Sequence, residues 1–264
     1  PAAAQSPAAT GDYQPSVGQS GKDVIWVPTP EGLVDRMLRM ARVGAGDFVI
    51  DLGAGDGRIA IAAAQNFRAR ARGIEFNPDM VALARRKAQA AGVASTVEFL
   101  QSDLFTADLG EATVITMYLL PSINLKLRPR LLELNPGTRI VSHAFDMGDW
   151  DADETSGADR SLAYLWVVPA QAGGTWKVEH PGPYGTQSFE MILRQKYQRV
   201  EGTVRRGTRL SPVTGILQGD RLRFTVADAE EGDRVFTGRV AGGTITGQTR
   251  TQGGTEIGFK AGLQ

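Results

Sequence analysis

The stretch Asp51-Leu52-Gly53-Ala54-Gly55-Asp56-Gly57-Arg58 decides the fold of this 264-residue chain. It directly follows the apolar run 48–50, which indicates a buried strand, and a helical pattern begins at about residue 58. Glycines adopt positive φ angles and let a ligand approach the backbone closely. The amides at the start of a helix suit a polar or anionic group. A strand, a glycine-rich turn and a helix in this order therefore indicate a ligand site at one edge of an α/β sheet.

The spacing of the glycines separates this turn from other nucleotide-binding turns. Gly53, Gly55 and Gly57 follow the pattern G-x-G-x-G, and Asp51 precedes them. A dinucleotide fingerprint would need its third glycine at position 58, which is Arg58. No Gly-Lys-Ser/Thr follows, so a phosphate-binding P-loop is excluded. An acid next to backbone amides suits instead the amine and carboxylate of the methionine part of S-adenosylmethionine (SAM).

Two further acids stand where the next strands are expected to end. Glu75 lies 20 residues after Gly55, at the end of the second strand, where an acid can accept hydrogen bonds from both ribose hydroxyls. Asp103 follows the third strand, expected at residues 97–100. For any one of these acids a solvated loop carboxylate is the ordinary explanation. Three acids at the carboxyl ends of neighbouring strands, where open α/β sheets bind ligands, favour a cofactor site.

Six short segments between residues 25 and 150 match one enzyme family. They are Val27-Pro28-Thr29-Pro30, the glycine-rich stretch 51–58, Tyr118-Leu119-Leu120-Pro121, Leu125-Lys126-Leu127-Arg128-Pro129, Pro136-Gly137-Thr138-Arg139-Ile140-Val141-Ser142-His143 and Asp146-Met147-Gly148-Asp149-Trp150. Residues 48–105 resemble class I SAM-dependent methyltransferases. The wider stretch resembles bacterial relatives of the mitochondrial ATP synthase c-subunit lysine methyltransferase. The resemblance implies SAM as the cofactor. It also implies that Asp103 and the backbone of Leu104 meet the adenine, and that Thr29 and the segment before it fold over SAM.

Residues after the fourth and fifth expected strands would face the methyl acceptor. Tyr118 directly follows the expected strand 113–117 and could line an acceptor channel. The alternative is that its ring is part of the hydrophobic core. The Asp/Asn-Pro-Pro-Tyr/Phe motif of DNA adenine methyltransferases is absent here, which disfavours base modification. His143 follows the strand 138–142 and could accept a proton, orient the acceptor or be structural. Asp146 could pair with a cationic substrate or occupy a turn.

The resemblance favours methylation of a lysine amine in a protein. A lysine must first lose its proton, which costs roughly 4–5 kcal/mol at pH 7, and an apolar channel lowers this cost. No strong catalytic base is then needed. One alternative is a small-molecule N-, O- or S-methyltransferase. Another is a SAM-binding module without turnover whose β domain binds a partner.

Composition excludes several kinds of site. The chain has 29 basic and 29 acidic side chains, so broad electrostatic capture of nucleic acid or of an anionic membrane is not expected. It has no cysteine, which excludes disulfides and thiolate chemistry, and only two histidines, too few for a histidine-based zinc site. No apolar run approaches the roughly 20 residues of a membrane helix.

The chain divides into three expected parts. Residues 1–22, rich in Ala, Gly, Pro and Ser, predict a flexible arm. Residues 23–170 predict a Rossmann-like sheet with helices on both faces, whose first helix is capped by Thr29, with Pro30 in its first turn. Residues 171–264 carry about eight short strands, typical of a small antiparallel barrel or sandwich. The first residues resemble a signal-peptide cleavage region, whereas SAM supply favours the cytoplasm, so localisation stays open.

Overall fold

The computed structural model describes most of the chain as two compact units. The first contains residues up to Arg128 together with Ile140–Leu165, and the second contains Pro129–Arg139 together with Trp166–Gln264. The division expected at residue 170 stays a prediction, and the arm expected at residues 1–22 lies partly outside the described residues. The described residues are 13–22, 25–158, 161–182, 185–227, 232–250 and 254–264.

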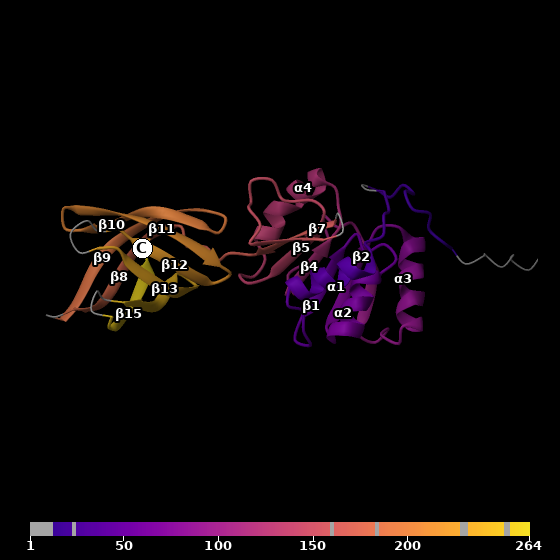
Figure 1. The fold of residues 1–264 in the computed structure, drawn as a ribbon, viewed down its shortest axis with the longest axis horizontal. Helices are drawn as coiled ribbons and strands as arrows, with labels where there is room; N and C mark the ends of the chain where they lie inside the picture. The colour runs from indigo at the N-terminus through magenta and orange to yellow at the C-terminus, as the bar shows by residue number, and fades with distance from the viewer. Residues whose placement is uncertain (1–12, 23–24, 159–160, 183–184, 228–231, 251–253) are drawn as a thin grey trace, which may run out of the picture. The chain divides into compact units, whose positions relative to one another are not determined.

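Seven strands form one mixed sheet. They are β1 (Phe48–Leu52), β2 (Arg70–Glu75), β3 (Val97–Gln101), β4 (Val114–Met117), β5 (Arg139–His143), β6 (Glu154–Ala158) and β7 (Ser161–Val167). Their order is β3-β2-β1-β4-β5-β7-β6 (Figure 1). Strands β1 to β4 pair in parallel, whereas β6 and β7 form an antiparallel pair that the sequence analysis did not foresee. The order reverses between β1 and β4, which is where open α/β sheets bind ligands.

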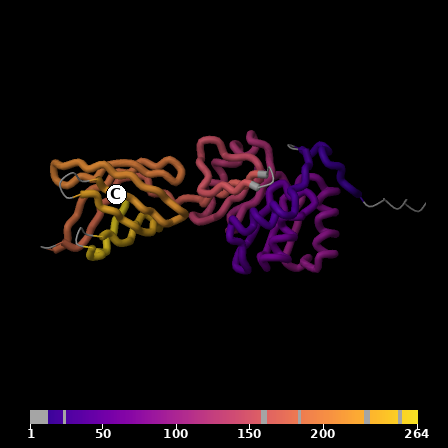
Figure 2. The backbone as a smooth tube through the Cα atoms, in the orientation of Figure 1, coloured from indigo at the N-terminus to yellow at the C-terminus, as the bar shows by residue number. Residues whose placement is uncertain are grey.

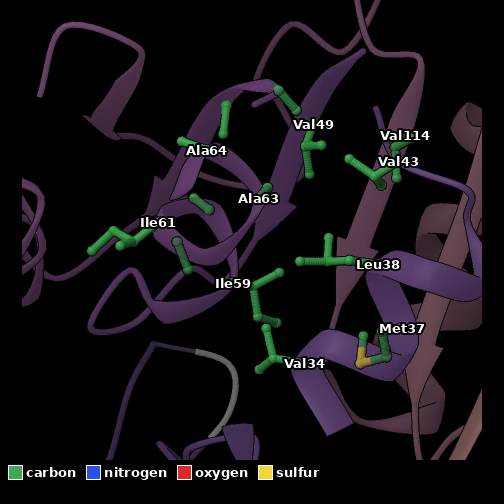
Figure 3. Close-up of a cluster of buried hydrophobic side chains, with 14 of the residues drawn as sticks. Val34, Met37, Leu38, Val43, Val49, Ile59, Ile61, Ala63, Ala64 and Val114 are labelled. Carbon is green, nitrogen blue, oxygen red and sulfur yellow. The ribbon is translucent and has the colours of Figure 1, made fainter. Parts of the chain in front are cut away.

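Among the described residues, four helices accompany this sheet, as expected for the Rossmann-like fold. They are α1 (Glu31–Met40), α2 (Arg58–Phe67), α3 (Pro78–Ala90) and α4 (Pro121–Leu132). One core cluster joins Val34 and Leu38 of α1 to Ile59 of α2 and to Val49 and Val114 of the sheet (Figure 3). Every residue of β1 is buried, as a central parallel strand covered on both faces should be. In the part of the chain that the structure describes, no helix is long and apolar enough to cross a membrane.

The expected role of Thr29 as a helix cap is wrong. Pro30 occupies the cap position itself, with φ −58° and ψ 142°, and no side chain caps the helix. Because the first helical residue is Glu31, Thr29 stands one position too early to receive the free amides of the first turn. Its hydroxyl oxygen instead lies 3.1 Å from Nδ1 of His143.

The C-terminal part is a closed antiparallel barrel, one of the two architectures that the sequence left open. Its strands are β8 (Gly174–Gly182), β9 (Gly185–Lys196), β10 (Arg199–Arg206), β11 (Arg209–Gln218), β12 (Arg221–Val226), β13 (Arg234–Ala241), β14 (Thr244–Arg250) and β15 (Glu256–Leu263). The path of this part of the chain is coloured orange to yellow in Figure 2. Pairing of β15 with β8 closes it. The interior is filled by side chains: the rings of Phe224 and Phe236 stack with centroids 4.8 Å apart, and Phe259 lies edge-on to both.

The barrel core predicts a strong effect of one truncation. Phe236 is fully buried, so Phe236→Ala should lower the free energy of unfolding by about 3–5 kcal/mol through lost burial and a residual cavity. Urea unfolding measures this change. Leu210 is 64% exposed, so Leu210→Ala should change stability by less than about 0.5 kcal/mol. Equal effects of the two variants would contradict the filled interior.

Candidate functional site

A cleft opens at the carboxyl ends of β1, β2 and β4. Eight of the eleven predicted site residues line it, whereas Gly57, His143 and Asp146 do not. The eight are Thr29, Asp51, Gly53, Gly55, Glu75, Asp103, Leu104 and Tyr118. Residues 19–22 and 25–29, which precede α1, contribute a further wall that includes Lys22 and Trp26. The predicted acids therefore do converge, and the segment before Thr29, which the resemblance implied would fold over SAM, lines the same cleft.

The glycine-rich turn serves both the cleft and the sheet. Gly53, Gly55 and Gly57 have φ angles of 73°, 54° and 84°, which L side chains rarely adopt. A Cβ atom on Gly57 would lie 2.5 Å from the ring of Phe99, so this glycine packs against the sheet. The amides of Gly53 and Ala54 donate to the carbonyl of Ile74 at 2.9 and 3.0 Å. The first amides of the turn thus tie β1 to β2.

Asp51 is a buried carboxyl group at the end of β1. It is 2% exposed, and Thr116 donates a hydrogen bond of 2.7 Å to it. Burial raises its pKa to about 7, although the Thr116 hydrogen bond opposes the shift and the carboxylates of Asp56 and Glu75 add to it. A ligand ammonium group would remove this penalty by pairing with the ionised form. Asp51 therefore fits the amine of an amino-acid moiety.

Glu75 is held in place at the end of β2. Its Oε2 accepts from the amide of Gly55 and its Oε1 from the amide of Asn77, each at 2.9 Å. A carboxylate has about four lone-pair sites, so acceptor capacity remains on both oxygens. The two amides fix the direction of the carboxylate at the cleft, which suits it to accept ribose hydroxyls.

Asp56 belongs to the glycine-rich motif, where the sequence suggested no role for it, and the structure places it in an ion cluster. Its Oδ2 lies 2.8 Å from Nη2 of Arg58 and 2.6 Å from Nζ of Lys87. Burial by itself would raise the pKa of Asp56, but hydrogen bonds from Arg58 and Lys87 outweigh it and lower the pKa. Nη1 of Arg58 also donates to the carbonyl of Thr29 at 3.0 Å. The cluster thereby fastens the N-terminal wall to the glycine turn.

Asp103 is paired with a residue that the sequence analysis did not single out. Nζ of Lys22 lies 2.5 Å from Oδ2 of Asp103 and 4.8 Å from the ring centroid of Phe76. The amide of Phe105 donates to Oδ1 at 2.8 Å. The hydrogen bond from Lys22 is the main cause that lowers the pKa of Asp103. Lys22 and Asp103 are 81 positions apart, so no local signal could have linked them.

Tyr118 and His143 form an aromatic pair at the other end of the cleft. Their ring centroids are 3.8 Å apart, and the ring of Phe145 lies 6.3 Å from that of Tyr118. Burial lowers the pKa of His143 to about 4, so its ring is neutral at pH 7. Asp146 is exposed, and its Oδ1 accepts from the amide of Gly148 in a turn. Tyr118 thus lines the cleft, His143 stands behind it, and Asp146 lies outside.

Asn124 of α4 fixes the loop that carries Phe145. It is fully buried, and its Nδ2 donates to Oγ of Ser142 and to the carbonyls of Phe145 and Asp146, at 3.3, 3.2 and 3.1 Å. The loop needs this support because Ala144 has a φ of 65°, which is costly for a residue with a Cβ atom. No local pattern pointed to this role, since the partners lie in β5 or just after it, 18 to 22 positions along the chain.

Several known proteins are similar to this chain. The family model of the ANTKMT methyltransferase domain matches residues 51–154. A protein-lysine N-methyltransferase of Saccharolobus islandicus (strain REY15A) is 42% identical over 151 residues, which are 55% of this chain and 94% of that protein. The ATP synthase c-subunit lysine N-methyltransferase of Homo sapiens is 32% identical over 170 residues, which are 64% of this chain and 70% of that protein. These matches confirm the resemblance found in the sequence.

One similar solved structure is that of an enzyme named for a different methyl acceptor, RNA. It is the crystal structure of an RNA methyltransferase from Salinibacter ruber in complex with S-adenosyl-L-homocysteine. It is 55% identical, with a TM-score of 0.55, and covers 55% of this chain and 95% of that chain. The ligand of that structure is the demethylated form of SAM.

His143 predicts a pH dependence of stability. Its pKa falls from 6.5 to about 4 on folding, so its stabilising contribution is present above pH 6.5 and is lost as the pH falls toward 4. Between pH 7 and pH 5 this residue should account for a decrease of about 2 kcal/mol in the free energy of unfolding. Urea unfolding of His143→Gln should lack that part of the decrease.

His180→Gln is the matched control for this measurement. It removes the other histidine of the chain and should keep the pH-dependent decrease. A His143→Gln variant that loses as much stability as the unchanged chain between the two pH values would show that His143 is not buried in its neutral form.

Proposed function

The chain belongs to the SAM-dependent protein-lysine N-methyltransferases, and we propose that its acceptor lysine reaches the cofactor past the wall formed by Tyr118. The observation that carries this proposal is the position of Tyr118, which follows β4 at the end of the cleft that Asp51 and the glycine turn line. Its ring is backed by His143 and neighboured by Phe145. An aromatic wall of this kind suits an amine and its alkyl chain.

The cleft residues fit SAM in their chemistry. Asp51 would pair with the methionine amine, and Glu75 would accept the ribose hydroxyls. Asp103 and the backbone of Leu104 would lie at the adenine end, and Thr29, Gly53 and Gly55 would border the cofactor. When bound, SAM supplies a methyl group already activated on a sulfonium. The protein therefore mainly has to align the two reactants and keep water out.

The acceptor lysine must arrive as a neutral amine, and the site can favour that form without a base. His143 is a poor proton acceptor, because burial lowers its pKa to about 4, far below that of an amine. A neutral His143 also adds no positive charge beside Tyr118. The aromatic wall excludes the water that would hydrate an ammonium group, which destabilises the charged form of the lysine. The lysine therefore loses its proton to solvent on entry. His143 acts here by holding Tyr118 and Thr29.

Asp51 predicts a pH-dependent affinity for SAM. Because its pKa in the free protein is about 7, much of it is protonated at lower pH, and only the ionised form attracts an ammonium group. Affinity measured by calorimetry should rise as the pH increases from about 5.5 to 7, by up to about tenfold per unit. Asp51→Asn should weaken binding by at least about tenfold and flatten this profile.

Asp35→Asn controls for loss of a carboxylate at an unrelated place. Asp35 is partly exposed on α1 and pairs with Arg39 at 2.6 Å. This variant should bind SAM as the unchanged chain does, at every pH. An Asp51→Asn variant that keeps both affinity and slope would remove Asp51 from the cofactor site.

The acceptor class is tested by incubating the enzyme with SAM labelled in its methyl group and a cell extract. We expect label in protein, as methylated lysine in peptide mass spectra. RNA is the second candidate, favoured by the 55% identical Salinibacter ruber structure. Label that is lost on ribonuclease treatment and survives protease would establish RNA as the acceptor. Label only in the low-mass fraction would establish a small molecule, and no transfer would indicate a binding module.

Tyr118→Ala separates the acceptor wall from the cofactor site. It should lower the rate of lysine methylation by about 10- to 100-fold through lost alignment, while SAM affinity changes by less than about threefold. Phe67→Ala is a control aromatic truncation on α2, where Phe67 packs beneath Arg39. An unchanged rate in Tyr118→Ala would place the acceptor elsewhere.

A further inference from the structure

A shallow groove crosses the outer face of the barrel from β11 to β14. Three arginines line it, together with polar side chains from the neighbouring strands. The arginines are Arg221, Arg223 and Arg239, and the polar residues are Gln218, Thr237 and Thr246. Leu222 of β12 and Gly238 of β13 also line it, and the pairing of these two strands places them side by side. We call this feature the arginine groove.

The register of the strands concentrates like charges in the groove. Arg221 stands directly opposite Arg239, and Arg223 lies two residues further along β12 on the same face. Like charges directly opposite one another on adjacent strands are destabilising. Asp220 pairs with Arg239 at 2.7 Å, but none of the described residues that line the groove is acidic. The barrel thus maintains a local excess of positive charge that an anionic partner would relieve.

We propose that the arginine groove binds an extended acidic segment of a partner protein. Arg221 and Arg223 are two residues apart on one strand, a separation of about 6.6–6.8 Å. An extended peptide repeats its same-face side chains at that interval, so carboxylates at alternate positions can each meet an arginine. Guanidinium groups bind carboxylates through two parallel hydrogen bonds. The hydroxyl group of Thr246, which stands opposite Arg239 in the register of β13 and β14, provides a further donor.

One apolar residue at the arginine groove indicates which side chains the partner segment should carry. Ile216 is 47% exposed and stands opposite Arg223 in the register of β11 and β12. It offers a small apolar contact between charged neighbours. The segment that fits best therefore has acidic residues at alternate positions and an apolar side chain next to one of them.

Two other polyanions fit this surface less well. Single-stranded nucleic acid usually stacks its bases on aromatic side chains, and no aromatic residue is among those described at the groove. The chain as a whole has no net charge, which limits long-range attraction of a phosphate backbone. A membrane surface is broad and meets protruding groups, whereas these arginines line a shallow groove.

The test is fluorescence anisotropy with the full chain and a labelled peptide of alternating Glu and Ser that contains one Leu. The groove variant carries Arg221→Gln, Arg223→Gln and Arg239→Gln. The control variant carries Arg194→Gln, Arg205→Gln and Arg250→Gln, which removes the same charge from barrel arginines that pair with Glu201, Glu190 and Glu256. Thermal unfolding and SAM binding verify that both variants are folded.

We expect the unchanged chain to bind the peptide, and the groove variant to bind it at least about tenfold more weakly, since it removes three ion pairs with the peptide. The control variant should lose less than about threefold, and added salt should weaken binding by the unchanged chain. The proposal is overturned by no binding to the unchanged chain, by equal losses in both variants, or by tighter binding of an oligouridylate of equal length. None of these results depends on methyl transfer, so the inference stands or falls apart from the proposed function.

Discussion

The cleft is organised around one costly feature, a carboxyl group at the end of a strand that is buried along its whole length. Asp51 lies near the end of β1, and the strand's burial removes most water from its side chain. Thr116 of the adjacent β4 supplies a hydrogen bond that only partly offsets the lost hydration. In the free protein this group is therefore only about half ionised at pH 7, and a cationic ligand would favour its charged form. A site of this kind selects its ligand by charge as well as by shape.

The rest of the cleft is built by contacts that fasten the chain before α1 to the sheet. Arg58 holds the carbonyl of Thr29, Lys22 pairs with Asp103, and the Thr29 hydroxyl meets His143. Each contact joins this segment to a different strand end or turn. The segment is therefore part of the cleft. Loss of any one of these three contacts should shift the position of the whole segment. His143 connects this segment to Tyr118, since it meets the Thr29 hydroxyl and its ring lies against that of Tyr118.

The barrel, unlike the cleft, has a filled interior. Its interior is occupied by packed side chains, with Phe224, Phe236 and Phe259 in mutual contact, so no ligand chamber is expected there. On its outer face, Arg221 and Arg239 stand directly opposite one another because of the strand register. A closed barrel has no free edge, so it can carry a charged docking surface without risk of edge-to-edge association.

The sequence by itself determined the features that local pattern controls. The glycine turn, the acids Asp51 and Glu75 at successive strand ends, and the eight C-terminal strands all follow from short-range spacing and turn residues. Tertiary structure alone decided what depends on distant pairing: the closure of the barrel by Lys260 beside Glu179, and the meeting of Thr29 with His143 across 114 positions. The prediction that Thr29 caps α1 was wrong for the same reason, because the Thr29 side chain meets a distant partner and not the adjacent helix. Spacing specifies which groups a strand presents at its end, whereas only the folded chain specifies which groups they meet.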